Sequence, residues 1–406
     1  MSIRIDPHRL ITNLLTLRKF GAEGNGVVRT TFSPPDIESR HWLRSRYVEA
    51  GLEAEIDGVG NVFGFTRHPG KRLLLGSHSD TQVTGGWLDG ALGVIYALEV
   101  ALTLQENDLN LAVDVVSWSD EESSFLGTLG SRSFCGLVDA REIDLAIGKD
   151  GRTLRQALAD CGLAEVPAVV GNPDNYLGYL EAHIEQGPFL EAERKTIGVV
   201  TSIVGMMDFE IVFSGEQNHA GTTPMTLRKD AGMALMGFVA DLNQRMKSES
   251  GPHSVWTAGR VNFEPGAPSI VPGRATMHWQ FRDPEQKRVM RFSEVTEQAV
   301  AAFNATHDVH AKLSLTDESA SAQKMDETLV ACLGRVAEGL CPGKWMHMPS
   351  GAAHDAQILA QIMPAAMLFI PSIGGVSHSF AEDSHQSDIV AGCQVMLDAV
   401  VERFSI

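Results

Sequence analysis

The sequence has few of the features that mark several common classes of protein. Its 406 residues include only five cysteines, which are scattered and form no CxxC pair. This pattern predicts unpaired thiols in a reducing compartment, not a disulfide framework. No apolar run is long enough to span a membrane, and the opening MSIRIDPHRL lacks the apolar stretch of a signal peptide. We therefore expect a cytoplasmic protein with no membrane partner.

Positive charge is also scarce. The chain has 33 Lys and Arg against 51 Asp and Glu, for a net charge of -18. Nucleic acids and anionic membranes both need clustered cations, so we expect no nucleic-acid partner either. The remaining composition, 44% hydrophobic and 21% charged, is ordinary for a globular protein. At this length it predicts a sizeable core and two or more domains.

Both ends of the chain alternate strand-like and helix-like segments, the pattern of an α/β fold. Apolar runs predict strands over 72–76, 111–119, 176–183 and 366–371. Helical spacing predicts helices over 90–106, 327–340 and 387–404. We expect these segments to form one discontinuous catalytic domain, made of residues 1–204 and 317–406.

The pattern of predicted strands and helices changes between these two parts, over residues 205–316. Residues 274–282 alternate between apolar and polar, which predicts a half-buried strand of an antiparallel sheet. Further strands are expected over 207–213 and 310–315, and helices over 231–246 and 285–304. We expect an inserted α+β sandwich built from two strands, a helix, two strands and a helix.

The first cluster of chemically active residues is GSHSDTQVTGGWLDG, residues 76–90. His78 and Asp80 follow a predicted strand directly, and Asp89 opens the next helix. Ligands gather at the carboxyl ends of strands in open α/β sheets, so the position suits a site. A histidine two residues before an aspartate also suits a metal ligand held by a neighbouring carboxylate. Taken alone, the pattern is more simply explained by a helix cap and a packed histidine.

The second cluster, SDEESS, follows another predicted strand. Its acids Asp120, Glu121 and Glu122 would repel one another inside a fold unless a cation neutralised them. A solvated loop is the commoner explanation for an isolated acidic run.

Histidines in segments rich in small residues recur at four further places, and each of them alone is more often an ordinary surface residue. These are His183, His219, His354 and His378. The interpretation changes when these histidines are considered together with the acids of the first two clusters. Together they supply the imidazoles and carboxylates that divalent metals prefer. The candidate ligands are His78, Asp89, Glu122, His183 and His378.

Together these segments resemble the hydantoinase/carbamoylase group of di-zinc, exopeptidase-like amidohydrolases. That group includes N-carbamoyl-L-amino acid amidohydrolases, allantoate amidohydrolases and β-ureidopropionases. The resemblance runs from about residue 60 to the C-terminus, and HIEQGP (183–188) and NHAGTTPM (218–225) are its most specific motifs. It implies a di-zinc aminopeptidase-like α/β domain with an inserted dimerisation domain. It also implies two divalent metal ions (Zn, Mn, Co or Ni), a homodimer and a small carboxylate-bearing substrate.

The resemblance also implies a role for each candidate residue. One ion would be held by His78, Asp89 and His183, and Asp89 would bridge to a second ion held by Glu122 and His378. Glu121 would be the general base, with Asp80 beside it in the catalytic set. The residues implied to handle substrate are Gln186, His219, Arg282, Gly351, Ala352 and His354.

Two of these substrate residues carry further expectations. His219 would reach the site from the partner subunit and stabilise the developing oxyanion. Arg282 is suited to clamp a substrate carboxylate through two hydrogen bonds. The alternative is an ordinary ion pair of Arg282 with Asp283 or Glu285.

The implied activity is hydrolysis of an N-carbamoyl (ureido) acid to amine, ammonia and carbon dioxide. An N-acyl amino acid amidase or dipeptidase on the same scaffold is the alternative. A third interpretation is a metal-dependent binding protein without turnover. The presence of Glu121, the implied general base, argues against it. The chain departs from the family where EESSFLG replaces the usual EEGSRF, which removes an arginine and shortens the loop, and at Ser269, where many members have asparagine. Both departures bear on the choice of substrate.

Overall fold

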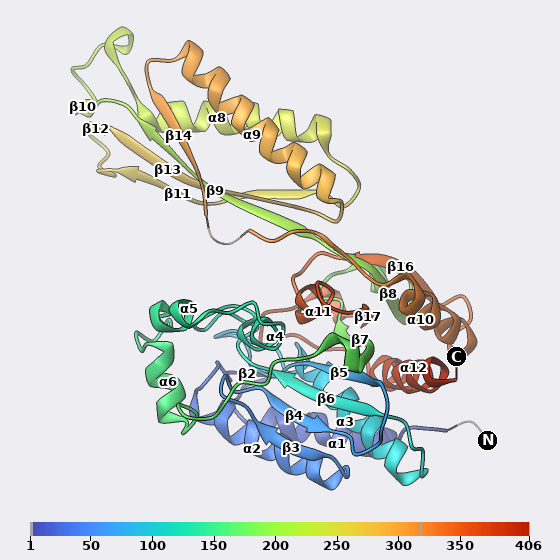
Figure 1. Ribbon diagram of the computed structural model, residues 1–406. Coiled ribbons are helices and arrows are strands. Elements are labelled where there is room, and N and C mark those ends of the chain that lie inside the picture. Colours follow the sequence, from blue (N-terminus) through green and yellow to red (C-terminus); the bar gives the residue numbers. More distant parts are fainter. Residues whose placement is uncertain (1–2, 317–318, 406) are drawn as a thin grey trace. The chain divides into compact units, whose positions relative to one another are not determined.

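The computed structural model describes residues 3–316 and 319–405, and the chain forms two compact units (Figure 1). Unit 1 is Met1–Thr201 with Lys324–Ile406, and unit 2 is Ser202–Gln323. The predicted boundaries fall at 204/205 and 316/317, and those of the structure at 201/202 and 323/324. The segment that ends unit 2 belongs there because Ala320 exchanges two backbone hydrogen bonds with Met206, at 2.8 and 2.9 Å.

Unit 1 is built on a nine-stranded sheet with the order β15-β8-β17-β7-β5-β6-β4-β3, and β16 pairs with β8. Its strands are β3 (Glu53–Ile56), β4 (Val62–Phe65), β5 (Arg72–His78), β6 (Val113–Trp118), β7 (Tyr176–Ile184), β8 (Ile197–Ile203), β15 (Gln323–Lys324), β16 (Trp345–Ser350) and β17 (Ala365–Ile370). The central strands β17, β7, β5 and β6 run parallel, whereas β4 and β8 pair antiparallel to their neighbours. The residues of β6 and β17 are buried throughout, because a parallel sheet is covered on both faces.

The helices of unit 1 are α1 (Pro7–Lys19), α2 (Pro34–Glu49), α3 (Ala91–Glu106), α4 (Leu129–Phe134), α5 (Ala140–Leu145), α6 (Leu154–Asp160), α7 (Phe189–Ala192), α10 (Glu327–Leu340), α11 (Asp355–Leu359) and α12 (Gln386–Phe404). Short 3-10 turns lie at Pro173–Asn175 and Ile373–Gly375, and β1 (Ala22–Glu23) pairs with β2 (Gly26–Val27). Helix α3 is buried from Ala91 to Leu104, because it packs on β5, β6 and β7 and is itself covered by α1 and α12. A helix that is apolar on all sides requires such a place.

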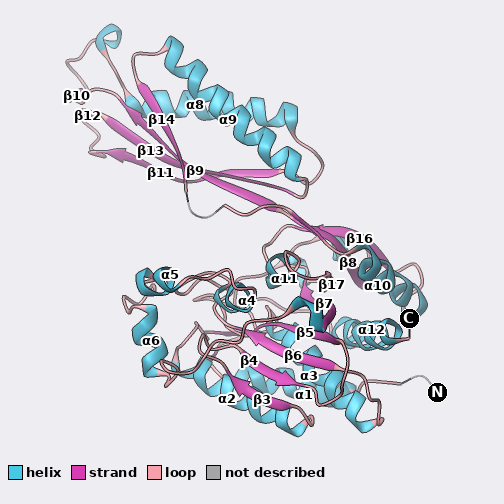
Figure 2. Ribbon diagram, in the orientation of Figure 1, coloured by secondary structure: helices cyan, strands magenta, loops and turns pink. Residues whose placement is uncertain are grey.

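Unit 2 has an antiparallel four-stranded sheet with the order β11-β13-β9-β14. Its elements are β9 (Gly205–Ser214), β10 (Asn218–His219), the 3-10 turn Met225–Leu227, α8 (Ala231–Glu249), β11 (Val255–Glu264), β12 (Ile270–Val271), β13 (Arg274–Asp283), α9 (Gln286–Thr306) and β14 (His310–Leu315). Helices α8 and α9 lie on one face of the sheet (Figure 2). The inward residues of β13, from Ala275 to Phe281, bury their side chains against them.

The predicted order of elements in this unit was wrong. The main elements run strand, helix, two strands, helix, strand, whereas the sequence predicted two strands, a helix, two strands and a helix. The strand that the sequence did not predict is β11, which lies at the edge of the sheet and is largely exposed. An edge strand that buries few side chains lacks the apolar alternation by which a strand is detected.

The α/β class with an inserted α+β unit is confirmed. Within residues 3–316 and 319–405, none of the helices combines the length and the apolar character that crossing a membrane requires.

Candidate metal centre and active site

The candidate residues of unit 1 meet at the carboxyl edge of its parallel strands. His78 is the last residue of β5, and His183 lies one residue before the end of β7. The acidic run from Asp120 to Glu122 begins two residues after β6 ends. Because these strands are parallel neighbours, their ends bring the three segments together.

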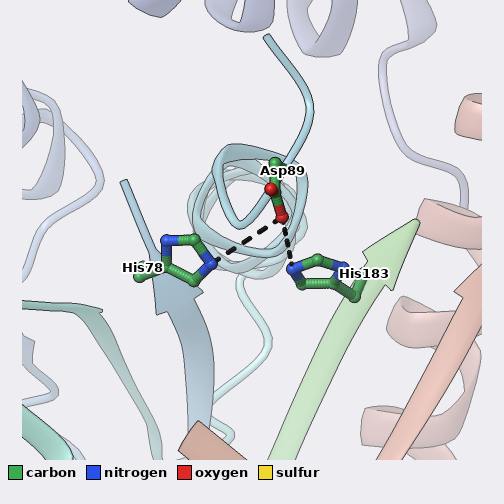
Figure 3. A group of neighbouring side chains, drawn as sticks. All are labelled: His78, Asp89 and His183. Carbon is green, nitrogen blue, oxygen red and sulfur yellow. Dashed lines mark ion pairs between the residues drawn. The ribbon is translucent and has the colours of Figure 1, made fainter. Parts of the chain in front are cut away.

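The first group consists of His78, Asp89 and His183, which are all buried (Figure 3). One oxygen of Asp89, Oδ1, lies 3.2 Å from Nε2 of His183 and 4.0 Å from Nε2 of His78. Figure 3 shows the two imidazoles approaching the carboxylate from β5 and β7. The possible ligand atoms of this group lie within 4.8 Å of one another.

The second group consists of Asp89, Glu122 and His378, and it uses the other oxygen of Asp89. Nε2 of His378 lies 3.2 Å from Oδ2 of Asp89 and 3.8 Å from Oε1 of Glu122. Burial alone would raise the pKa of Asp89, but the close approach of the His183 and His378 rings lowers it well below its usual range. Asp89 is therefore an ionised carboxylate with one oxygen in each group.

Hydrogen bonds to carbonyl groups fix which imidazole nitrogens face the carboxylates. Nδ1 of His78 lies 3.1 Å from the carbonyl oxygen of Asp80, and Nδ1 of His183 lies 2.9 Å from that of Ile184. A carbonyl oxygen only accepts, so each Nδ1 carries a hydrogen. Nε2, which faces Asp89, is then the nitrogen that can serve as a metal ligand.

Buried carboxylate oxygens without hydrogen-bond donors fit a cation at this place. They are Oδ1 of Asp80, Oδ2 of Asp89 and Oε1 of Glu122. Burial, followed by the charge of Asp89, raises the pKa of Glu122 to about 7. Burying such oxygens is costly unless an opposite charge compensates them. The donor set of imidazoles and carboxylates therefore fits divalent metal ions.

Glu121 lies beside the first group without belonging to it. Its Oε2 is 3.8 Å from Nε2 of His78, and 12% of its side chain is exposed. Burial raises the pKa of Glu121 well above its usual range, and the charges of Glu122, Asp355 and Asp80 act in the same direction against that of His78. A carboxyl group that can hold a proton and is still reached by solvent has the properties of a general base.

Asp80 is fully buried beneath these groups. Its Oδ2 accepts the hydroxyl of Thr31 at 2.9 Å and the N–H of Glu122 at 3.2 Å, and its Oδ1 lies 3.7 Å from Nδ1 of His78. These contacts tie the end of β5 to the acidic run after β6.

Four of the six residues expected to handle substrate belong to unit 1, and two of them, Gln186 and His354, contact the same groups. Gln186 donates from Nε2 to Oδ1 of Asp89 at 3.0 Å. His354 is buried, with its ring 4.6 Å from that of His183, and burial lowers its pKa well below the usual range. His354 is therefore a neutral imidazole. The N–H of Ala352 donates to Oγ of Ser350 at 3.1 Å, and the neighbouring Gly351 is exposed.

The other two, His219 and Arg282, belong to unit 2. His219 is exposed on β10, and its Nδ1 accepts the N–H groups of Gly221 at 3.0 Å and Thr222 at 3.1 Å. Nδ1 is thus an acceptor, so the hydrogen of the neutral ring lies on Nε2, which can donate. Ser269 lies beside this loop, because its carbonyl accepts the N–H of Ala220 at 2.9 Å.

Arg282 lies near the end of β13, on the face opposite the helices. Its Nε donates to Oε1 of Gln280 at 3.1 Å. The two acids considered as its alternative partners, Asp283 and Glu285, both pair with Arg288, at 3.0 and 2.9 Å.

The loop in which the family's arginine is missing lines a cavity of about 220 Å³ next to Glu122. Phe125 forms part of its wall, together with Thr31, Gln82 and Lys149. The segment that departs from the family pattern therefore lines the same cavity as the candidate metal ligand Glu122.

One buried acid at this site was not predicted from the sequence. Glu382 accepts hydrogen bonds from the backbone of Asp89 and from the segment that carries His378. The only signal in the sequence is an acid four residues after a histidine in the small-residue segment GGVSHSFAED. That spacing alone does not distinguish a buried acceptor from a solvated acid.

Comparison with known proteins places this arrangement in a family. The sequence profile of peptidase family M20/M25/M40 matches residues 74–402. The chain belongs to this family. It is 33% identical to an N-carbamoyl-L-amino-acid amidohydrolase of Paenarthrobacter aurescens and 32% identical to an allantoate amidohydrolase of Escherichia coli. The matches cover 96% of both chains in the first case and 94% in the second.

A solved structure shares the whole architecture. It is an amidase of the hydantoinase/carbamoylase family from Burkholderia phymatum, with a TM-score of 0.93 and 48% sequence identity. The match covers 100% of this chain and 99% of that one. The resemblance inferred from the motifs is confirmed, and the protein is a hydrolase of a metal-dependent family.

Proposed function

We propose that the protein hydrolyses the ureido C–N bond of an N-carbamoyl amino acid, or of a similar small carboxylate-bearing acid. The products are the free amine, ammonia and carbon dioxide, formed from one ureido acid and one water. The single observation that carries the proposal is the shared Asp89 carboxylate, with one group of candidate ligands at each oxygen and Glu121 alongside. His183 supports the ureido class, since it matches the histidine of the carbamoylase branch. The names of the relatives point to the same class.

Two divalent ions, of Zn, Mn, Co or Ni, belong to this proposal. His78, Asp89 and His183 would hold one, and Asp89, Glu122 and His378 the other. When bound, such ions supply Lewis acidity, which polarises a carbonyl group and lowers the pKa of water.

Proton transfer falls to Glu121. Its carboxylate takes a proton from the attacking water and passes it to the departing nitrogen. The place of Glu121 suits both steps, because its Oε2 lies 3.8 Å from Nε2 of His78 and 12% of the side chain is exposed. In a dimer, Nε2–H of His219 from the partner subunit would donate to the developing oxyanion.

Arg282 is proposed to clamp the substrate carboxylate, and this gives a testable expectation. Arg282→Ala should raise KM by about 10- to 100-fold, because a hydrogen bond to a charged group contributes about 1.5–3 kcal/mol. The matched control is Arg274→Ala, an exposed arginine on the same strand that pairs with Glu264 at 3.3 Å and should leave KM unchanged. Steady-state kinetics with one ureido acid suffice. An unchanged KM in Arg282→Ala would remove the clamp from the account.

Unit 2 is proposed to join two copies of the chain and to close over the site. Strand β11 ends its sheet with a largely exposed edge, and Met233 and Met236 on α8 are 60% and 50% exposed. An open strand edge and exposed methionines are surfaces that a second copy can cover. We expect multi-angle light scattering to give twice the chain mass under assay conditions. An active monomer would contradict both the dimer and the donated His219.

The five cysteines are unpaired in the structure. Free thiols persist in a reducing compartment, which supports a cytoplasmic location.

Paired substrates test the proposed reaction directly. N-carbamoyl and N-acetyl derivatives of the same amino acids are incubated with the metal-loaded protein, and amine and ammonia are both measured. Equimolar amine and ammonia from the carbamoyl series is the expected result. Amine without ammonia, from the acetyl series only, would replace the proposal with an N-acyl amino acid amidase.

A further inference from the structure

Glu382 is a buried acid, 2% exposed, to which neither a metal nor a substrate role has been assigned above. Its Oε1 accepts the backbone N–H of Asp89 at 3.0 Å and that of Leu88 at 3.2 Å. Its Oε2 accepts the hydroxyl of Ser377 at 2.8 Å. One carboxylate therefore joins the segment that carries Asp89 to the segment that carries His378.

Gln186 closes this connection into a ring. Its Nε2 lies 3.0 Å from Oδ1 of Asp89 and 3.3 Å from Oγ of Ser377. The ring thus runs from the carboxylate of Asp89 through Gln186, Ser377 and Glu382, and returns to the backbone N–H of Asp89. Asp89 is held at both its backbone and its side chain.

Two residues at this ring of hydrogen bonds have an unusual backbone conformation. His378 has a φ of 50°, and Gln186 has a φ of 58°, a region that residues other than glycine seldom occupy. Such conformations persist where surrounding contacts enforce them. Gly86 leaves the room that the acid needs, because a Cβ at that position would lie 1.8 Å from Oε1 of Glu382.

We propose that Glu382, with Ser377 and Gln186, is a positioning residue that keeps Asp89 and His378 in register for a shared metal site. Two of the three possible ligands of the second group, Asp89 and His378, lie on the segments that Glu382 joins. The inference rests on the proposed metal-dependent function. It assigns Glu382 no contact with metal or substrate.

Glu382→Gln keeps the shape of the side chain but cannot accept from Leu88, Asp89 and Ser377 together. We expect the more weakly held zinc ion to bind 10- to 100-fold less tightly, the range found when a group that supports a metal ligand is lost. The readout is the zinc dissociation constant, measured on the full chain without substrate by competition with a chromophoric chelator. Activity should recover as zinc is raised, because the defect lies in metal retention.

Asp57→Asn is the matched control. Asp57 is also a buried acid of unit 1, and it accepts the backbone N–H groups of Val59, Asn61 and Val169 at 3.1, 2.8 and 3.1 Å. Because it touches none of the candidate ligands, its replacement should leave both zinc dissociation constants within twofold of the original chain.

Ser377→Ala is the milder second variant, since it removes only the hydroxyl that joins Glu382 to Gln186. We expect it to weaken the same zinc ion by several fold, and it decides the matter if Glu382→Gln does not fold. The proposal would be overturned if a folded Glu382→Gln variant bound both zinc ions within twofold of the affinities of the original chain. If Glu382→Gln does not fold, the same result in Ser377→Ala would overturn it. Turnover of ureido acids by the original chain is measured separately, so a failure here is distinguishable from a failure of the proposed function.

Discussion

Glu121→Gln is expected to lower kcat by about 10²- to 10⁴-fold, the contribution of a well-placed general acid–base group. Glutamine keeps the shape of the side chain but cannot take up the proton of the attacking water. Glu121 lies outside both groups of possible ligands, so the variant should keep the metal content of the original chain. Single-turnover kinetics together with metal analysis of the same sample give both quantities.

The control for this variant is Glu99→Gln. Glu99 is a fully buried acid on α3 that pairs with Arg9 at 2.7 Å, away from the metal centre. Its replacement should leave kcat unchanged, whatever it does to stability. Full activity in Glu121→Gln would show that another group moves the proton. Loss of metal from Glu121→Gln would show that this residue acts as a ligand.

Asp89→Asn is expected to have the largest effect on metal binding. Each oxygen of Asp89 faces a different group of ligands, and asparagine offers one oxygen and no charge. The original chain should bind two ions, and Asp89→Asn no more than one at the same free metal concentration. The activity should fall by more than about 100-fold, the upper range for residues that only support a ligand. Calorimetric titration of the metal-free chain with zinc measures the stoichiometry.

His378→Ala separates the two groups, because His378 belongs only to the second. It should retain one ion with an affinity close to that of the tighter site in the original chain. Two ions retained in Asp89→Asn, or none in His378→Ala, would contradict a carboxylate shared between the groups.

The parallel strands of unit 1 were predictable because burial on both faces makes their sequences almost continuously apolar. The predicted strands over 72–76, 111–119, 176–183 and 366–371 correspond to β5, β6, β7 and β17. Helix α3 was predictable from the helical spacing of its apolar residues. Strand β11 was not, since its exposed edge position leaves no apolar pattern to detect.

The site was predictable from its residue types as a set of candidate ligands at strand ends and at the start of a helix. Only the family resemblance implied that Asp89 joins two groups of ligands, and the structure brings the same two groups together. The residue types alone do not specify which oxygen of Asp89 faces which histidine, because that depends on side-chain rotamers and on Gln186. The metal-binding and catalytic roles of these residues stay predictions.

Glu382 is an example of a site residue that the sequence did not predict. Two of the groups that donate to it, the N–H groups of Leu88 and Asp89, lie 294 and 293 residues away in the chain, and only the fold brings them to Glu382. No local pattern distinguishes such an acid from a solvated one. Likewise, the sequence did not indicate that the N–H of Ala352, a residue implied to handle substrate, donates to the hydroxyl of Ser350.

The most direct test of a metal centre built around Asp89 is anomalous diffraction at the zinc edge from crystals of the zinc-loaded protein. We predict two peaks in each chain. One should lie about 2.0–2.1 Å from Nε2 of His78 and Nε2 of His183, and the other at the same distance from Nε2 of His378, with one oxygen of Asp89 bound to each. A single peak, or peaks away from Asp89, would contradict the account.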